Sequence, residues 1–402
     1  MRRAVQFTAA ALLAVQLGAV AGLAIIDSTR KRQRKPYRFP TAPAEPVTAA
    51  DDQVTVYTYG RDLYSDMLDA IDNAERTVWF ETFIWKSDTT GQRFKDALVR
   101  AASRGVEVFV VFDDFANLVV PRAFLKLPPS IHVHRRPATP VPWSPRRWGR
   151  DHRKLLVVDE RVGFVGGYNI GTLYARHWRD THVRLEGPAV LELGNAFADF
   201  WNMHKRPGQP ELASPLGRAW ESRIRVHRNV PRLRVYPIRN MYLEAIDKAA
   251  DRIWLTHAYL IPDDDLVAAL VAAVKRGVDV RIIVPAESNH VVADWLSRGF
   301  YDRLLRNGVR LFLYQGAMVH AKTATIDGVW STVGTANLDR LSLWGNYEIN
   351  LEVTDDDVAA RMEQIFALDE GNSRELTLDR WQGRSLIAKA TETVLSPWRP
   401  LF

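Results

Sequence analysis

The chain has 402 residues, of which 47% are hydrophobic and 25% are charged, a composition typical of a globular protein with two or three domains. It contains no cysteine, which excludes disulfides, thiolate metal ligands and a cysteine nucleophile. The formal net charge of +7 arises within residues 2–38, which hold eight Lys or Arg and one acid. The remainder is neutral, unlike a basic nucleic-acid-binding domain.

An apolar segment opens the chain. Residues 4–26 carry no charge and as a helix would span about 34 Å, enough to cross a bilayer core. We predict a single-pass transmembrane anchor at residues 1–27; a cleaved signal peptide is the alternative, because Ala19-Val20-Ala21 resembles a cleavage site. Six basic residues follow the segment, which places the downstream side in the cytoplasm and attracts anionic lipid headgroups. Residues 28–50, basic and then rich in Pro and Ala, are expected to form a linker.

Strand and helix patterns then alternate in two units. In the first unit, residues 51–205, strands are predicted at 54–59, 77–85, 106–112, 154–158 and 182–186, with a helix at 92–103. A Pro/Gly-rich stretch from residue 206 marks the boundary. In the second unit, residues 206–402, strands are predicted at 233–237, 252–260, 278–285, 309–314 and 347–353, with helices at 263–276 and 290–307. This alternation predicts α/β domains with parallel or mixed sheets. The tail, residues 386–402, either rests on a membrane or packs on the second domain.

One motif, His-x-Lys-x4-Asp-x6-Gly-x-x-Asn, occurs twice. The first copy is His152, Lys154, Asp159, Gly166 and Asn169. The second copy is His320, Lys322, Asp327, Gly334 and Asn337. An acid, Asp180 or Glu348, lies 28 residues after the histidine of each copy. Flanking strings also recur at similar offsets, so the repeat is a duplicated domain rather than a solenoid with its short period.

These residue types suit phosphoryl transfer. A near-neutral imidazole attacks phosphorus or transfers a proton near pH 7. A His and a Lys two residues apart on a strand share one face, so each Lys would neutralise a phosphate held by its His. Two facing copies would form one composite site in which one His becomes a phosphohistidine and the other acts as acid and base. The cationic and amide groups would stabilise charge as a metal does elsewhere; the chain has no H-E-x-x-H, G-x-S-x-G or P-loop motif.

Each motif residue receives an expected role. The predicted catalytic residues are His152, Lys154, Asp159, His320, Lys322 and Asp327. The predicted phosphate-binding residues are Asn169 and Asn337. Asp180 and Glu348 are each expected to bind the far ring nitrogen of one His and fix its tautomer. For Asp159 and Asp327 a structural role is equally compatible with the pattern, because both stand before turn-forming residues.

The paired motifs resemble those of the phospholipase D superfamily, the HKD enzymes, over about residues 54–369. Within it, GGYNIGTLY, RGVDVRIIVP and GTANLDRLSLWGNYEINLEV resemble bacterial cardiolipin synthases. The resemblance implies an α/β fold of two duplicated phospholipase D-like domains that form one composite active site, here with an N-terminal transmembrane helix. One departure is the residue after the motif glycine, often Ser in the superfamily but Gly167 and Thr335 here, so the two halves are expected to bind phosphate unequally.

The resemblance also implies an activity. It predicts a phosphatidyltransferase in the bacterial inner membrane, with its catalytic region in the cytoplasm, that makes cardiolipin by way of His152. The donor would be phosphatidylglycerol, with phosphatidylethanolamine as the alternative, and no cofactor or metal is expected. A hydrolytic phospholipase D remains open, and an HKD nuclease is disfavoured by the neutral catalytic region, so no nucleic-acid partner is expected. The oligomeric state is left open.

A basic and aromatic cluster surrounds the first motif. Its members are Arg135, Arg136, Trp143, Arg146, Arg147, Trp148, Arg150, Arg153 and Lys154. Arg interleaved with Trp suits a phospholipid surface, with the rings at headgroup depth, but also single-stranded nucleic acid or a plain solvated loop. Just upstream, His132-Val133-His134 is interpreted as a plain surface strand, with a metal site as the alternative.

Overall fold

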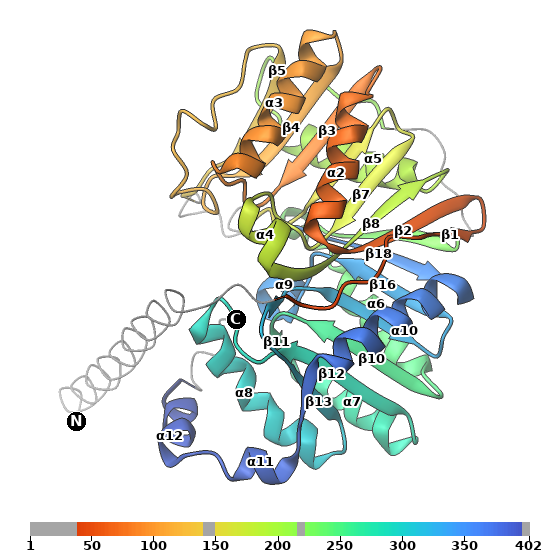
Figure 1. The fold of residues 1–402 in the computed structure, drawn as a ribbon, viewed down its shortest axis with the longest axis vertical. Helices are drawn as coiled ribbons and strands as arrows, with labels where there is room; N and C mark the ends of the chain where they lie inside the picture. Colours follow the sequence, from red (N-terminus) through yellow and green to blue (C-terminus); the bar gives the residue numbers. More distant parts are fainter. Residues whose placement is uncertain (1–37, 140–148, 215–221, 396–402) are drawn as a thin grey trace, which may run out of the picture.

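The computed structural model describes residues 38–139, 149–214 and 222–395, and within them the chain forms two α/β halves (Figure 1). The predicted anchor at residues 1–27 lies outside these residues. Among the helices that the structure does describe, none combines the length and the apolar character needed to cross a bilayer.

The first sheet is mixed. Its strands, in order across the sheet, are β1 (Pro46–Ala49), β2 (Asp52–Tyr59), β8 (Trp178–Glu186), β7 (Val162–Gly166), β6 (Leu155–Val158), β3 (Thr77–Thr82), β4 (Glu107–Asp113) and β5 (Ile131–Arg136). The strands β3, β4 and β5 are parallel, and the other neighbours in this order are antiparallel; a ninth, short strand pairs with β8 in parallel. Helices α2 (Gly60–Asp72) and α3 (Thr89–Ser103) contribute to the core on one face, and α5 (Val190–His204) to the core on the other.

The second sheet repeats this plan. Its order is β19 (Ser373–Leu376), β13 (Arg310–Tyr314), β12 (Asp279–Pro285), β10 (Arg252–His257), β15 (Lys322–Ile326), β16 (Trp330–Gly334), β18 (Glu348–Thr354) and β9 (Ile224–Asn229). Its longer helices are α6 (Pro237–Lys248), α7 (Asp264–Lys275), α8 (Val291–Arg306) and α10 (Asp356–Gly371). From β9 to β13 the order matches that from β2 to β5 in the first sheet, strand for strand, so the duplication seen in the sequence is a duplication of the fold.

Local signals explain several element ends. Helix α3 begins where the Asp88 carboxylate accepts a hydrogen bond from the Gly91 amide at 3.0 Å, which satisfies a free amide of the first turn. It ends just before Gly105, whose φ of +91° favours glycine. Helix α10 begins in the same way, with Asp355 accepting from the amides of the first turn. Of these signals, only Gly105 marks a helix end that the sequence analysis predicted; α3 begins three residues before the predicted start, and α10 was not predicted.

Three sequence predictions need correction or completion. Residues 46–49, expected to end a linker, form β1 and pair with β2. The strand predicted at 233–237 is wrong: Pro231 and Pro237 lack amide protons, and the segment instead holds a short 3₁₀ turn, η2 (Pro231–Leu233), followed by α6. The edge strand of this half lies upstream, as β9. The tail helix α12 (Leu386–Leu395) packs against α8 in the second half; residues 396–402 lie outside the described part.

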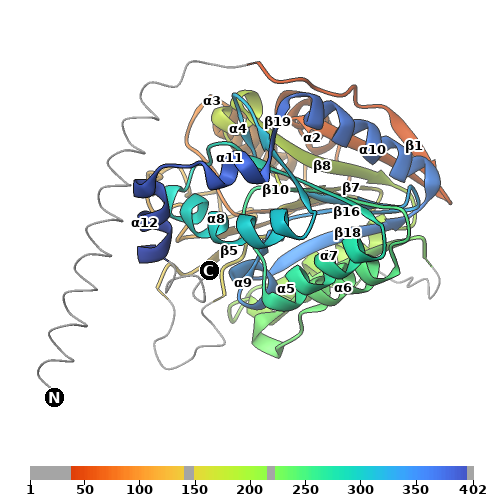
Figure 2. The same cartoon turned by 90° about the horizontal axis from the view of Figure 1, so that it is seen from below.

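The two halves share one core. Val183 and Leu185 of the first sheet lie in the same apolar cluster as Ile349 and Leu351 of the second. Figure 2 shows helices α2 and α10 on one side of the strands and α5, α6 and α7 on the other. Because this cluster is buried only when both halves are present, each half stabilises the other.

A buried ion pair also links the halves. The guanidinium of Arg179, at the start of β8, binds both carboxylate oxygens of Asp369 in α10, at 3.0 and 2.7 Å. Both side chains are almost fully buried. Burial raises the pKa of Asp369, against the opposing effect of Arg179.

We predict that Asp369→Ala lowers the free energy of unfolding by about 3–5 kcal/mol, because Arg179 becomes an unpaired buried cation. Urea denaturation measures the change. The matched control is Glu244→Ala, which breaks an exposed pair with Lys248 worth about 0–1 kcal/mol. Equal losses in the two variants would contradict the prediction.

Candidate active site

Each motif histidine is held by the opposite half of the molecule. The short strand β14 (Met318–Val319) runs parallel to the start of β8, and the next amide, of His320, donates to the Arg179 carbonyl at 2.6 Å. In the other direction, Asp151 forms a parallel bridge with Tyr347, and the His152 amide donates to the Tyr347 carbonyl at 3.0 Å. Because Arg179 and Tyr347 directly precede Asp180 and Glu348, each His lies beside the acid of the other half.

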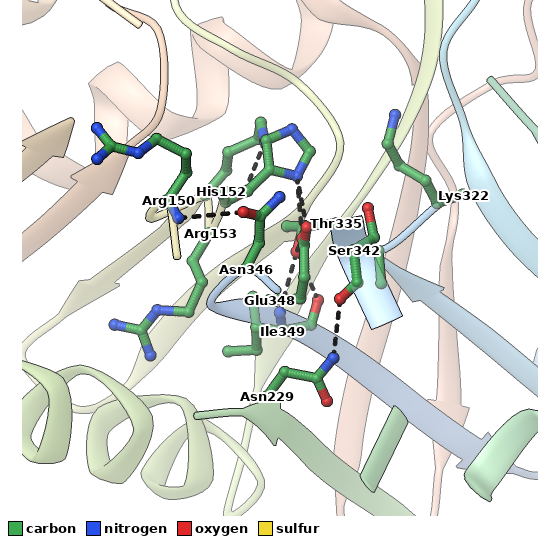
Figure 3. A network of polar contacts seen from close by, with 12 residues as sticks. Arg150, His152, Arg153, Asn229, Lys322, Thr335, Ser342, Asn346, Glu348 and Ile349 are labelled. Carbon is green, nitrogen blue, oxygen red and sulfur yellow. Dashed lines mark hydrogen bonds and ion pairs between the residues drawn. The ribbon is translucent and has the colours of Figure 1, made fainter. Parts of the chain in front are cut away.

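The imidazole–carboxylate pairs are therefore crossed. His152 Nδ1 lies 2.9 Å from Glu348 Oε2, and His320 Nδ1 lies 2.6 Å from Asp180 Oδ2 (Figure 3 shows the first pair). With its carboxylate ionised, each Nδ1 carries the proton that the carboxylate accepts, and each Nε2 keeps its lone pair; Lys322 Nζ also lies 3.0 Å from His320 Nδ1. Burial lowers the pKa of His152 well below its usual range and that of His320 to about 3, with nearby lysines contributing. Both rings are therefore neutral near pH 7.

Two buried lysines complete the cluster. Lys154 Nζ donates to the His152 carbonyl at 2.7 Å, and Lys322 Nζ donates to the His320 carbonyl. Burial lowers the pKa of Lys154 to about 7 and that of Lys322 to about 8, and raises that of Glu348 to about 8. These three groups therefore titrate as a set near neutral pH. With all ionised, the two lysines balance Glu348 and Asp180, and a bound phosphodiester would add one negative charge.

The halves differ at the residue after the motif glycine. A Cβ on Gly167 would lie 2.0 Å from Asp180 Oδ1, so Asp180 occupies the space of the missing side chain. In the second half, Thr335 donates a hydrogen bond of 2.5 Å to Glu348 Oε2. Burial raises the pKa of Asp180, but its contacts with His320 and Lys322 outweigh this and lower it. Gly167 and Thr335, the two departures from the superfamily pattern, therefore affect the surroundings of the carboxylates of Asp180 and Glu348, respectively.

The motif asparagines are buried beside the histidines' strands. Asn169 Oδ1 accepts from the Ile84 amide at 3.1 Å, which leaves its Nδ2 side to donate. Asn337 is also buried, and its Oδ1 has no hydrogen-bond partner within the described part of the chain. The two amide side chains are therefore held differently.

Asp159 and Asp327 are not brought to the histidines. The Asp159 carboxylate accepts from the amides of Glu75, Arg76 and Thr77 at 2.8–2.9 Å, at the far end of β6 from His152. The strand β6 separates Asp159 from His152, a distance of roughly 13 Å for its four residues. In the second half the Asp327 carboxylate accepts from the amides of residues 250–252 in the same way. Both acids have positive φ, near +53°, and lie in the turn that follows their strand. Their carboxylates bind the start of the neighbouring strand, β3 or β10.

The basic cluster of the first motif is only partly a surface. Arg153 is buried and binds Glu81 through three hydrogen bonds, the shortest 2.6 Å. Arg136 is buried as well, and Lys154 belongs to the active site. The expectation of a basic lipid-facing loop is thus wrong for Arg136, Arg153 and Lys154, whose charged groups are buried within the protein. Trp143, Arg146, Arg147 and Trp148 lie outside the described residues.

No group of three or more His, Asp or Glu side chains suited to a metal occurs within residues 38–139, 149–214 and 222–395. The pair His132 and His134 lies on β5, where His132 stacks on Phe109 with ring centroids 4.8 Å apart. His134 faces helix α5, with its ring 5.9 Å from that of His204.

The comparisons with known proteins agree with this geometry. The family model described as "Cardiolipin synthase, PLD-like domain" matches residues 67–201 and 242–369, one segment in each half. The chain belongs to this family. "Major cardiolipin synthase ClsA" of Bacillus subtilis (strain 168) is 31% identical over 367 residues, 87% of this chain and 76% of that protein. "Cardiolipin synthase A" of Pseudomonas putida (strain W619) is 34% identical over 338 residues, 82% of this chain and 70% of that protein.

A solved structure shares the fold. The phosphatidylserine synthase of Haemophilus influenzae Rd KW20 superposes with a TM-score of 0.70 over 90% of this chain and 95% of that one, at 14% identity. Because the match covers nearly all of both chains, the other chain contains both α/β halves as well.

Sequence reasoning missed several residues of this family member's site. Phe83 and Trp178 place their rings 4.9 Å from the imidazoles of His152 and His320, respectively. Arg179 and Tyr347 hold the histidine amides through their carbonyls. Arg179 and Tyr347 directly precede the orienting acids in the sequence, which was the available signal. Their contacts are made by backbone carbonyls, however, and such contacts do not require a particular residue type.

We predict that Gly167→Ala lowers turnover about a hundredfold while the protein stays folded, because the new Cβ displaces Asp180 from His320. Initial rates and circular dichroism test this. Gly371→Ala, where a Cβ meets nothing within 4 Å, is the matched control. A Gly167→Ala variant with the activity of the control would show that the Asp180–His320 contact does not matter.

Asp159→Asn separates a structural from a catalytic role. Asn tolerates the positive φ, but loses the charge that three amides contact, so we expect a loss of about 1–3 kcal/mol in the free energy of unfolding. The hydrogen bonds from these amides outweigh burial and lower the pKa of Asp159, so its stabilisation is present above the unfolded pKa and disappears as the pH falls through the folded pKa. Asp327→Asn serves as the equivalent in the other half. Turnover lost without a change in stability would instead support the catalytic role.

Proposed function

We propose that the protein is a cardiolipin synthase that transfers a phosphatidyl group from one phosphatidylglycerol to a hydroxyl of another through phosphatidyl-His152. The observation that supports this most is the pair of crossed carboxylate–imidazole contacts through Nδ1, which leaves the Nε2 atom of each ring to react, with a buried lysine held at the carbonyl of each histidine. The remaining roles follow from charge and burial.

In the first step, His152 Nε2 attacks the phosphorus, and the bond from phosphorus to the glycerol oxygen breaks. Lys154 and Lys322 neutralise the phosphoryl oxygens, with the amides of Asn169 and Asn337 as further donors. The anionic substrate raises the pKa of His320, so that His320 takes up a proton and delivers it to the departing glycerol. Glu348 holds the Nδ1 proton of the ring that becomes positively charged.

In the second step, His320 is neutral and removes the proton of the acceptor hydroxyl. The hydroxyl oxygen bonds to phosphorus, the P–N bond breaks, and its electron pair returns to His152 Nε2. The products are cardiolipin and glycerol, and both histidines regain their starting protonation when His320 releases its proton. Water at the acceptor position would give phosphatidic acid instead.

The two partner acids support the assignment of His152 as nucleophile. Asp180, with its lowered pKa, stays ionised and stabilises a protonated His320, as an acid–base residue requires. Burial lowers the pKa of His152 well below its usual range, so His152 stays an unprotonated nucleophile. We propose that Asp159 and Asp327 take no part in either step.

Exposed apolar side chains surround the site and support a lipid surface as the partner. They are Phe115, Leu118, Val119, Leu173, Leu341 and Trp344. The loop that holds the first three follows Asp113, which accepts from the amide of Asp151 next to His152. Helices α4 (Thr172–His177) and α9 (Arg340–Trp344), which carry the others, each begin three residues after a motif asparagine. We propose that this rim faces the inner membrane, to which residues 1–27 anchor the chain.

Product analysis tests the proposal. Purified full-length protein in phosphatidylglycerol vesicles with EDTA should yield cardiolipin and glycerol, measured by mass spectrometry. His152→Ala and His320→Ala should each lose turnover, because neither half performs both steps. Phosphatidic acid without cardiolipin would make the protein a hydrolytic phospholipase D, and turnover that survives either substitution would contradict the composite site.

A base-quenched reaction supplies the second readout. The phosphatidyl group should be found on the peptide that contains His152. Its appearance on the peptide with His320 would reverse the two roles but leave the proposed reaction in place.

A further inference from the structure

A second cavity lies beside the active site. It has a volume of about 320 Å³ and opens at the ends of β5 and α5. Its charged and titratable lining side chains are His134, Arg135, Arg136, His204, Arg206, Arg232 and Tyr347, of which Arg135 is paired with Asp114 at 2.9 Å. Among the described residues that line it there is no Asp or Glu, so the cavity is surrounded by positive charge.

The guanidinium groups are held at the wall. Arg136 is buried, donates to the Gly149 carbonyl at 2.8 Å and lies over the Tyr347 ring at 4.7 Å. Arg232 uses one N–H for the Met203 carbonyl at 2.7 Å, out of five donors. Arg206 is exposed, and its side chain makes no hydrogen bond or ion pair in the part of the chain that the structure describes. Planar guanidinium forks match phosphate oxygens, and two of these three are open to solvent.

Two histidines line the cavity: His134 is buried and has an unpartnered ring nitrogen, whereas His204 is half-buried and has partners for both of its ring nitrogens. His134 is 6% exposed, and its Nδ1 lacks a hydrogen-bond partner among the described residues. His204 Nδ1 contacts the Phe200 carbonyl, and its Nε2 lies 3.2 Å from the Tyr347 hydroxyl. Burial, together with Arg136, lowers the pKa of His134 to about 4 and that of His204 to about 3. An anion in the cavity would relieve this repulsion and give His134 a partner.

The cavity shares a wall with the catalytic centre. The ring of Tyr347 lines the cavity, while its carbonyl accepts from the His152 amide. The next residue, Glu348, orients His152. A ligand held against Tyr347 is thus separated from the nucleophile by one backbone segment.

We propose that this cavity is a second phosphate-binding site, for the phosphate group of an anionic phospholipid headgroup or for free phosphate, in addition to the site between the two histidines. The volume is sufficient for a phosphate with an attached glycerol but small for a drug-sized ligand. Only the choice of a lipid as the physiological source rests on the proposed function; the phosphate chemistry does not.

The test uses the full-length protein in detergent with His152→Ala as background, so that no lipid is consumed. Arg206→Gln with Arg232→Gln removes the two exposed guanidinium groups. Arg61→Gln with Arg93→Gln, exposed on α2 and α3 at the opposite face of the first sheet, is the matched control. Circular dichroism verifies folding, and equilibrium dialysis measures binding of inorganic phosphate in one arm and of dihexanoyl-phosphatidylglycerol in the other.

We expect the cavity variant, but not the control, to lose one bound phosphate per chain or to bind it at least about tenfold more weakly. Loss with inorganic phosphate identifies a general phosphate site, and loss only with the lipid identifies a headgroup site. Unchanged binding of both ligands in the cavity variant overturns the proposal. Arginine-dependent binding in a protein that makes no cardiolipin would uphold this site and refute the proposed function.

Discussion

The crossed contact between each motif histidine and the acid of the other half is the constraint on which the site depends. His152 binds Glu348, and His320 binds Asp180, while each histidine amide donates to the carbonyl of the residue before that acid. Neither half therefore contains an oriented imidazole of its own. The shared core and the buried Arg179–Asp369 pair stabilise the interface and hold these contacts in place. The site therefore forms only where the two copies of the fold meet, because each copy supplies the acid that orients the histidine of the other.

Charge balance explains how such a cluster stays buried. The charges of two lysines and two carboxylates cancel, and both imidazoles are neutral, so the cluster avoids the cost of uncompensated buried charge. In the proposed mechanism, an anionic phosphodiester changes this balance by one negative charge and favours proton uptake by His320. A low-dielectric, preorganised set of donors then acts on the phosphoryl oxygens without reorganisation. Outside this cluster, the exposed apolar rim and the basic cavity are the features on which the proposed lipid surface and second phosphate site rest.

The halves are duplicated but not equivalent. Gly167 makes room for a short acid, whereas Thr335 donates to a longer one. Arg153 and Glu81 form a buried pair beside the first motif, while Ala321 and Thr256 stand at the corresponding places of the second. Divergence of this kind is what two chemical roles require, since a nucleophile must stay unprotonated and an acid must hold its proton.

The sequence by itself determined the repeat, the residue types of the site and the α/β class. Motif spacing and strand alternation can be recognised over short stretches of sequence. A phosphohistidine mechanism requires the same few side-chain types in any fold, so these residues could be predicted without the structure. It was wrong for residues 233–237, where proline removes the amides that a strand needs, and ambiguous for Asp159, whose amide partners at residues 75–77 are distant in the chain.

Only the tertiary structure decided which acid pairs with which histidine, that Arg153 and Arg136 are buried, and that a basic cavity adjoins Tyr347. These depend on contacts between segments up to 196 residues apart, which residue spacing does not encode.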